Sequence, residues 1–194
     1  MTIYFSSCSR AFGELSNFYL CEIEYSGHTY PSIEHCYQAQ KFIEDSIRDR
    51  VANAPSPSAS KREATRYRSH VRPDWFDVNV PLMKELLHIK FGTHPHLRDL
   101  LLQTGTCTLV ECTGRDRFWG ATRDGRGRNV LGTLLMEVRD YRSNVHKSLR
   151  SSSLCRICDT SIGVTLCCRD YLCQSCMEYL RTTYGVICAP YTQC

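Results

Sequence analysis

Apolar and polar residues repeat with two different periods along the first 142 residues, and each period predicts its own kind of element. Alternation predicts short strands near residues 3–5, 21–30 and 108–112, with Gly27 turning the second stretch into a hairpin. Helical spacing or composition predicts helices over residues 33–43, 58–68, 82–91, 96–103 and 130–141. Ser32 precedes the first helix and is placed to cap it. The pattern therefore predicts an α+β domain dominated by helices, with few short strands.

Two stretches interrupt this pattern. Residues 114–127 carry four glycines, which predicts a loop. Residues 143–153 are polar, rich in serine and without periodicity, which predicts a linker. We therefore expect a main domain over residues 1–142, a linker over 143–153 and a small second module over 154–194.

Composition adds limits to this picture. Of 194 residues, 42% are hydrophobic and 23% are charged, which is typical of a folded globular protein and excludes global disorder. There is no run of 18 apolar residues, and the N-terminal residues do not resemble a secretory signal. We expect a cytoplasmic or nuclear protein with no membrane partner. The net charge of +4 is too small to require a polyanionic partner by itself.

Cysteine is the unusual residue of this chain. Eight of its 13 cysteines lie between residues 155 and 194. In a reducing compartment such a cluster favours metal binding over disulfides. The other five have no ligand spacing and are expected to be small core residues: Cys8, Cys21, Cys36, Cys107 and Cys112.

The C-terminal cysteines include two Cys-x₂-Cys pairs, the common spacing of structural zinc ligands. Their order resembles a RING finger. This resemblance implies one zinc ion on Cys155, Cys158, Cys173 and Cys176, and a weaker second on Cys168, Asp170, Cys188 and Cys194. Asp170 stands where RING domains usually have histidine, and Cys194 replaces the usual last ligand. We therefore expect one to two structural Zn²⁺ ions, and the resemblance implies a ubiquitin-conjugating enzyme as a partner.

Several segments of the main domain follow one another in the order of a known family. They are Leu15-Ser16-Asn17-Phe18, residues 30–35, residues 38–42, Lys90-Phe91, residues 101–105, Glu111, residues 116–120 and residues 127–139. Over residues 3–142 the chain resembles the NADAR superfamily, whose bacterial YbiA-type members are N-glycosidases acting on phosphorylated intermediates of riboflavin synthesis. The chain departs from this pattern near Lys61, where relatives carry a glycine soon after the basic residue.

The resemblance implies a helix-rich YbiA-like fold and marks Glu34, Asp116 and Trp75 as catalytic. Breaking a ribosyl C–N bond builds positive charge on the sugar, so a carboxylate near the anomeric carbon is chemically apt. Either Glu34 or Asp116 would activate water and stabilise that charge, while the other orients or protonates. Trp75 would stack on the leaving heterocycle. No organic cofactor is expected for this chemistry.

Further residues are expected to bind substrate. Five arginines between residues 115 and 128 suit a phosphate or diphosphate, whereas His35 is expected to be structural. The predicted substrate-binding residues are Ser16, Asn17, Phe18, Gln38, Lys41, Trp119, Gly120, Arg128, Asn129 and Gly132.

Three functions fit these patterns. The leading hypothesis is an N-glycosidase acting on a phosphorylated ribosyl or ADP-ribosyl small molecule. Because NADAR relatives include proteins that remove ADP-ribose from guanine in DNA, an ADP-ribosylated nucleic acid is an alternative substrate. The second hypothesis is a RING-type ubiquitin ligase whose NADAR domain binds ADP-ribose or a modified target without catalysis. The third is a binding protein that has lost both activities.

Overall fold

Strand β1 (Thr2–Phe5) lies parallel to β4 (Thr108–Glu111), with Phe5 opposite Glu111. Strands β2 (Ile23–Tyr25) and β3 (His28–Tyr30) form the expected hairpin, and both turn residues, Ser26 and Gly27, have positive φ. Two positive φ values in a two-residue turn match the twist of an antiparallel pair. All three predicted strand regions are therefore confirmed.

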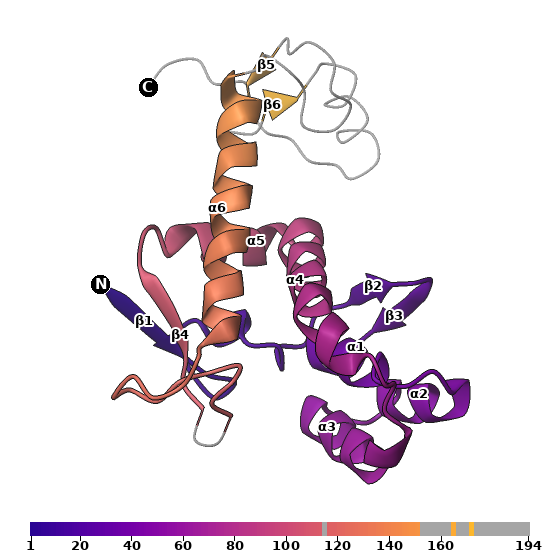
Figure 1. Ribbon diagram of the computed structural model, residues 1–194. Coiled ribbons are helices and arrows are strands. Elements are labelled where there is room, and N and C mark those ends of the chain that lie inside the picture. The colour runs from indigo at the N-terminus through magenta and orange to yellow at the C-terminus, as the bar shows by residue number, and fades with distance from the viewer. Residues whose placement is uncertain (114–115, 152–163, 166–170, 173–194) are drawn as a thin grey trace. The chain divides into compact units, whose positions relative to one another are not determined.

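The computed structural model describes residues 1–113, 116–151, 164–165 and 171–172 (Figure 1). The chain divides into two compact units, Met1–Asp140 and Tyr141–Cys194. The second unit contains the short antiparallel pair β5 (Val164–Thr165) and β6 (Tyr171–Leu172). The helices are α1 (Ile33–Ala39), α2 (Asp45–Ala52), α3 (Pro57–Arg66), α4 (Trp75–Thr93), α5 (Pro95–Gln103), α6 (Val130–Ser151) and the 3₁₀ turns η1 (Gly13–Leu15) and η2 (Arg68–His70).

Helix α1 begins as expected and ends earlier. The Ser32 hydroxyl accepts a hydrogen bond from the backbone N–H of His35, which satisfies a free amide of the first turn. The predicted helix continued to residue 43, but the chain leaves it after Ala39. Phe42 then pairs with Val71 in an isolated bridge, and the Arg72 amide donates to the Lys41 carbonyl. Pairing with a segment 29 residues away therefore overrides local helix propensity.

Three other helices differ from the sequence pattern. Helix α2 was not predicted, because Ile47 and Val51 are its only buried apolar residues. Helix α4 starts at Trp75, seven residues before the expected start at residue 82, and contains Pro81 in its first two turns. Helix α6 was expected to end at Tyr141 but runs to Ser151, so most of the predicted linker is helical.

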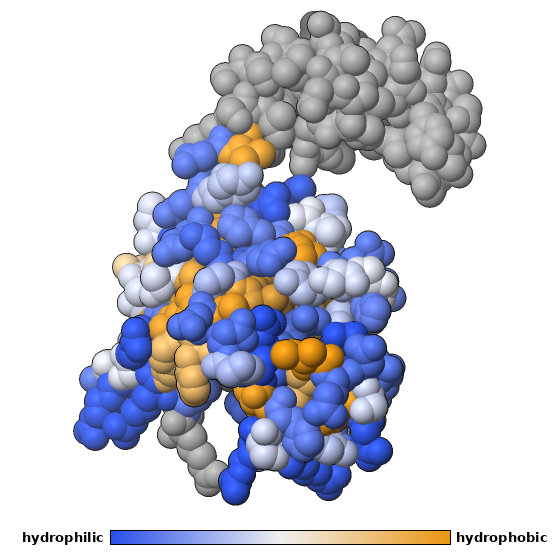
Figure 2. Space-filling model, turned by 45° about the vertical axis from the view of Figure 1, so that its right-hand side comes forward, coloured by the Kyte–Doolittle hydropathy of each residue, from blue (hydrophilic) through white to orange (hydrophobic). Residues whose placement is uncertain are grey.

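The core of the first unit lies where α1 packs against α2, α3 and α4. Helix α6 contributes Leu131, Leu134, Leu135 and Val138, all buried. The coloured surface that faces the viewer in Figure 2 is mostly hydrophilic, with smaller hydrophobic areas between the hydrophilic residues. None of the helices in the described part of the chain has both the length and the apolar character to cross a bilayer.

The cysteine expectations have mixed outcomes. Cys36 is buried as expected, Cys21, Cys107 and Cys112 are half-buried, and Cys8 is exposed, so its assignment to the core is wrong. The eight predicted zinc ligands lie outside the described residues. Within the described ranges, no group of three or more His, Cys, Asp and Glu side chains is arranged to hold a metal ion.

Candidate active site

The parallel pairing of β1 and β4 brings together two segments that lie more than 100 residues apart in the sequence. Ser6 and Ser7 follow β1, and Cys112 and Thr113 follow β4. Because the carboxyl ends of parallel strands meet at one edge, these four residues share one side of a cavity. The Cys112 amide donates to the Phe5 carbonyl at 2.7 Å, which holds the two segments together.

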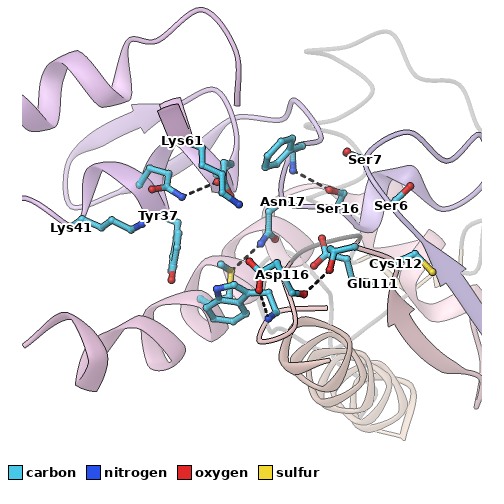
Figure 3. Close-up of a pocket in the computed structure, with 16 residues that line it drawn as sticks. Ser6, Ser7, Ser16, Asn17, Tyr37, Lys41, Lys61, Glu111, Cys112 and Asp116 are labelled. Atoms are coloured by element: carbon cyan, nitrogen blue, oxygen red, sulfur yellow. Dashed lines mark hydrogen bonds between the residues drawn. The ribbon is translucent and has the colours of Figure 1, made fainter. Parts of the chain in front are cut away.

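This cavity has a volume of about 230 Å³ and combines acidic, basic and aromatic side chains. Figure 3 shows Lys41, Tyr37 and Lys61 toward one side of it and Glu111 and Cys112 toward the other. The lining residues are Ser6, Ser7, Ser16, Asn17, Phe18, Glu34, Tyr37, Gln38, Lys41, Lys61, Met83, Glu111, Cys112, Thr113, Asp116 and Trp119.

Glu34 lies in the first turn of α1 and is 5% exposed. Its Oε1 accepts a 2.8 Å hydrogen bond from Nε2 of Gln38, one helical turn later. Burial raises the pKa of Glu34, while the Gln38 hydrogen bond and the charges of Lys61 and Lys41 oppose the rise. A carboxyl group of raised pKa is a stronger base once it is ionised, which suits proton transfer.

Asp116 is held differently, by the backbone of its own turn. Its Oδ1 accepts hydrogen bonds from the amides of Phe118 at 3.1 Å and Trp119 at 3.0 Å. These two amide hydrogen bonds fix the orientation of the Asp116 carboxyl group. The structure thus brings Glu34 and Asp116, which the sequence marked as catalytic, to the same cavity.

Glu111 is a third carboxyl group in this cavity, and the sequence analysis did not select it. It is the last residue of β4. Burial, together with the negative charges of Asp116 and Glu34, raises the pKa of Glu111 to about 7, and only Lys61 acts in the other direction. The cavity therefore contains a carboxyl group that changes charge near neutral pH.

Among the described residues, two lysines supply the positive charge of the cavity. Lys41 lies in the turn after α1, and its Nζ is 5.5 Å from the ring centroids of both Tyr37 and Trp75. Burial lowers the pKa of Lys41, although Glu34 partly offsets this effect. Lys61 reaches the cavity from α3. Ammonium groups bind phosphate as point charges, so these lysines could bind an anionic substrate group.

Trp75 does not line the cavity but packs behind it. Trp75 is the first residue of α4, and its ring centroid is 4.9 Å from that of Tyr37. The Tyr37 ring lies edge-on to the Trp119 ring, with 5.6 Å between their centroids. Tyr37 and Trp119 both line the cavity. The aromatic faces available to a leaving group are therefore those two, and Trp75 supports them.

The loop that carries Ser16, Asn17 and Phe18 closes another side of the cavity. The Glu34 amide donates to the Asn17 carbonyl at 3.1 Å, so this loop is joined to the start of α1. Asn17 Nδ2 lies 3.3 Å from the Met83 sulfur, an acceptor. Asn17 Oδ1 and Gln38 Oε1 are buried and have no hydrogen-bond partner among the residues that the structure describes. Both oxygens can accept hydrogen bonds from a ligand.

Four residues expected to bind substrate do not line this cavity: Gly120, Arg128, Asn129 and Gly132. Asn129 instead bridges the backbone of β4, accepting from the Glu111 amide at 3.1 Å and donating to the Leu109 carbonyl at 2.8 Å. A Cβ on Gly120 would lie 2.6 Å from the Glu111 carbonyl oxygen, and one on Gly132 would lie 2.1 Å from that of Leu109. Three of the four therefore support the end of β4.

The expected arginine cradle is not at this cavity either. Arg117, Arg123, Arg126 and Arg128 are exposed, and none of them lines it. The guanidinium of Arg128 lies 4.9 Å from the Phe118 ring, and Arg126 pairs with Asp124 at 2.8 Å. Arg115 lies outside the described residues.

His35 is structural, as expected. Its Nδ1 is 2.7 Å from the Ser32 hydroxyl and its Nε2 is 3.1 Å from the Ala54 carbonyl, so both ring nitrogens have partners. Burial lowers the pKa of His35. The ring joins the start of α1 to the turn before α3.

The sequence reasoning missed several lining residues because their place depends on distant pairing. Glu111 was noted only as part of a family pattern, and its position at the end of a short strand was the available signal. Lys61 was noted only as a departure from the family. Ser6, Ser7 and Thr113 carried no signal, since only the β1–β4 pairing brings them together.

Comparisons with known proteins agree with this fold. The profile of the NADAR domain matches residues 4–141. The N-glycosidase YbiA of Escherichia coli (strain K12) is 39% identical over 138 residues, 71% of this chain and 86% of that protein. A riboflavin biosynthesis protein of Vibrio vulnificus (strain YJ016) is 41% identical over 138 residues, 71% of this chain and 38% of that protein. The NMR structure of E. coli YbiA has a TM-score of 0.68 at 39% identity, over 76% of this chain and 87% of that chain.

Proposed function

This chain belongs to the NADAR domain family, and on that premise we propose that it is a hydrolase of N-glycosyl bonds whose substrate carries a phosphorylated ribosyl or ADP-ribosyl group. The observation that carries the proposal is that two carboxyl groups and two ammonium groups line the same cavity: Glu34, Asp116, Lys41 and Lys61. Hydrolysis of such a substrate requires a negatively charged protein group near the reacting carbon and positively charged groups that bind the phosphate.

The first requirement is stabilisation of a cationic sugar. As the bond from the anomeric carbon to nitrogen breaks, positive charge develops on the ribose ring. The Asp116 carboxylate, fixed by two amide hydrogen bonds, is suited to stabilise that charge without reorganising. Glu34 is suited to take a proton from the attacking water, because burial raises its pKa and Gln38 fixes its orientation.

The second requirement is binding of the rest of the substrate. Lys41 and Lys61 would bind a phosphate group, and Tyr37 and Trp119 would contact the leaving heterocycle. The unpaired oxygens of Asn17 and Gln38 would accept hydrogen bonds from ribose hydroxyls or from N–H groups. This reading keeps the sequence assignment for Ser16, Asn17, Phe18, Gln38, Lys41 and Trp119, and moves phosphate binding from the arginines to the lysines.

The deciding experiment compares substrate classes. Purified full-length protein is incubated with phosphoribosyl aminopyrimidines, ADP-ribose attached to guanine in DNA, and ADP-ribose attached to protein side chains, and the released ribose phosphate or ADP-ribose is measured. Catalytic release from one class supports the proposal and names the substrate. Tight binding of ADP-ribose without release from any class would favour the binding-only alternative, in which the C-terminal module acts as a ubiquitin ligase.

We also propose that the C-terminal cysteines bind one to two structural zinc ions in a RING-like module for protein interaction. The support is the Cys-x₂-Cys spacing at 155/158 and 173/176 alone. Metal analysis of the purified chain tests it, and an assay with ubiquitin-conjugating enzymes tests the ligase activity. We further propose a cytoplasmic or nuclear location, because thiolate ligands need a reducing compartment.

A further inference from the structure

We propose that Glu111 is a third catalytic carboxyl group, the acid that gives a proton to the departing nitrogen. This inference rests on the proposed N-glycosidase function and names one more of its catalytic groups. It starts from a contrast within the cavity: the Glu34 and Asp116 carboxylates are each bound to N–H donors, whereas the Glu111 carboxyl group has no hydrogen bond or ion pair to the described residues.

The backbone of Glu111 is held firmly although its side chain is free. Its amide donates to Asn129 Oδ1 at 3.1 Å, and its carbonyl accepts from the Ala121 amide at 2.9 Å. Gly120 packs so closely on that carbonyl that no larger residue fits without movement. A fixed backbone with an uncommitted carboxyl group is the arrangement needed to present a proton to a ligand.

The groups around Glu111 favour its neutral form. The negative charges of Asp116, in the following turn, and of Glu34, on α1, both oppose a further negative charge on Glu111. Lys61, from α3, is the cation that acts against them. With burial included, the pKa of Glu111 rises to about 7, so a substantial fraction of the group holds a proton at neutral pH.

The N–H donors around the three carboxyl groups indicate which of them accept a hydrogen bond and which can donate one. Glu34 receives an N–H from Gln38, and Asp116 receives two backbone N–H groups, so both are arranged as acceptors. Of the three carboxyl groups in the cavity, Glu111 alone lacks such a donor among the described residues. A protonated carboxyl group is itself a donor, so the third group supplies what the other two cannot.

The proposed step balances in atoms and charge. The Glu111 carboxyl proton passes to the leaving nitrogen, and the electrons of the C–N bond stay with that nitrogen. The oxygen of a water molecule bonds to the anomeric carbon, and its proton passes to the Glu34 carboxylate. Exchange with solvent then returns a proton to Glu111 and removes one from Glu34. The products are the free amine or base and the ribosyl group with a new hydroxyl.

The leaving group provides a sharp test. A phosphoribosyl aminopyrimidine needs a proton on its departing nitrogen, whereas nicotinamide mononucleotide releases neutral nicotinamide and needs none. Full-length wild-type protein, Glu111→Gln and the matched control Glu24→Gln, an exposed strand residue, are assayed on both. For Glu111→Gln we expect kcat to fall at least about 100-fold on the aminopyrimidine and less than about threefold on the nicotinamide compound, with Glu24→Gln unchanged.

The pH profile on the aminopyrimidine substrate gives a second, independent measurement. Wild-type kcat/KM should fall as pH rises through about 7, and Glu111→Gln should lose that fall. Equal losses on both substrates, or a fall in kcat/KM with pH that persists in Glu111→Gln, would overturn the assignment and leave a structural role. If the wild type hydrolyses neither substrate, the N-glycosidase proposal fails too. If it hydrolyses both and Glu111→Gln matches it, only the role of Glu111 fails.

Discussion

The ammonium group of Lys90 lies 2.9 Å from the backbone carbonyl oxygen of Ser16 and is fully buried. It also donates to the Glu14 carbonyl at 2.6 Å and lies 5.4 Å from the ring centroids of Tyr19 and Phe91. A lysine on α4 therefore holds the loop that carries Ser16 and Asn17 into the cavity. The Ser16 carbonyl also accepts from the Tyr19 amide at 3.2 Å, so Lys90 is one of its two donors.

Lys90→Met should therefore lower both stability and turnover. Losing the hydrogen bonds of the Lys90 ammonium to these two carbonyls costs about 1–3 kcal/mol in all, so the thermal transition should fall by several degrees. Burial lowers the pKa of Lys90 to about 8 in the folded chain, below its value in the unfolded chain. The stability of the wild type relative to Lys90→Met should consequently rise between about pH 8 and 10.5. Thermal melts across that range check this, with the half-exposed Lys84→Met as control.

Glu34→Gln and Asp116→Asn should each abolish hydrolysis, by at least about 1000-fold in kcat, without lowering the thermal transition. Both carboxyl groups are proposed to act on charge that develops during the reaction, and both amides keep an oxygen to accept the observed hydrogen bonds. Steady-state kinetics and melting curves on the same preparations measure the two effects. Retained turnover in either variant would remove that residue from the mechanism.

Glu111→Gln should stabilise the folded chain at alkaline pH. The folded-state pKa of about 7 lies above the unfolded value of 4.5, so folding favours the protonated form. Wild-type stability should fall as pH rises from about 4.5 to 7, and the glutamine variant should not share that fall. Melting temperatures at pH 5 and pH 8 test this. We expect the variant to melt at a higher temperature than the wild type at pH 8, and the difference to be smaller at pH 5. A variant that melts lower at both pH values would contradict it.

Gly132→Ala should destabilise the chain and reduce turnover together. The added Cβ would lie 2.1 Å from the Leu109 carbonyl and 2.4 Å from Asn129 Nδ2, so the bridge between Asn129 and β4 must shift. Overpacking of this kind typically costs about 1–3 kcal/mol. Gly13→Ala is the matched control, because its Cβ would make only an ordinary 3.6 Å contact. Equal melting temperatures for the two variants would show that β4 adapts freely.

Removal of zinc should leave the hydrolase activity within a few-fold of its initial value, since every described residue that lines the cavity lies before position 120. Cys155→Ser should lose more bound metal than Cys194→Ser, because the second predicted site includes the weaker ligand Asp170. Metal content and turnover of the full chain, measured before and after chelation, check both statements. A drop in rate of more than about tenfold, roughly 1.4 kcal/mol, would show that the cysteine module contributes to the active site.

The sequence by itself determined the local elements and part of the site. Ser32 as a cap, the hairpin around Gly27 and the short strands at residues 2–5 and 108–111 are encoded by neighbouring residues, whose conformational preferences act over a few positions. The order of motifs between residues 15 and 139 also indicated the family. It pointed to Glu34 and Asp116 before any cavity was known.

Tertiary structure decided which residues face the cavity. The parallel pairing of β1 with β4 is a long-range contact that no local pattern predicts, and it alone places Glu111 beside Ser6 and Asp116. Long-range contacts also end α1 at Ala39. They place Asn129 and Gly132, which were expected to contact the ligand, against the backbone of β4 instead. The pKa of Glu111 also follows from this assembly, because burial and neighbouring charges exist only once the strands and helices have packed.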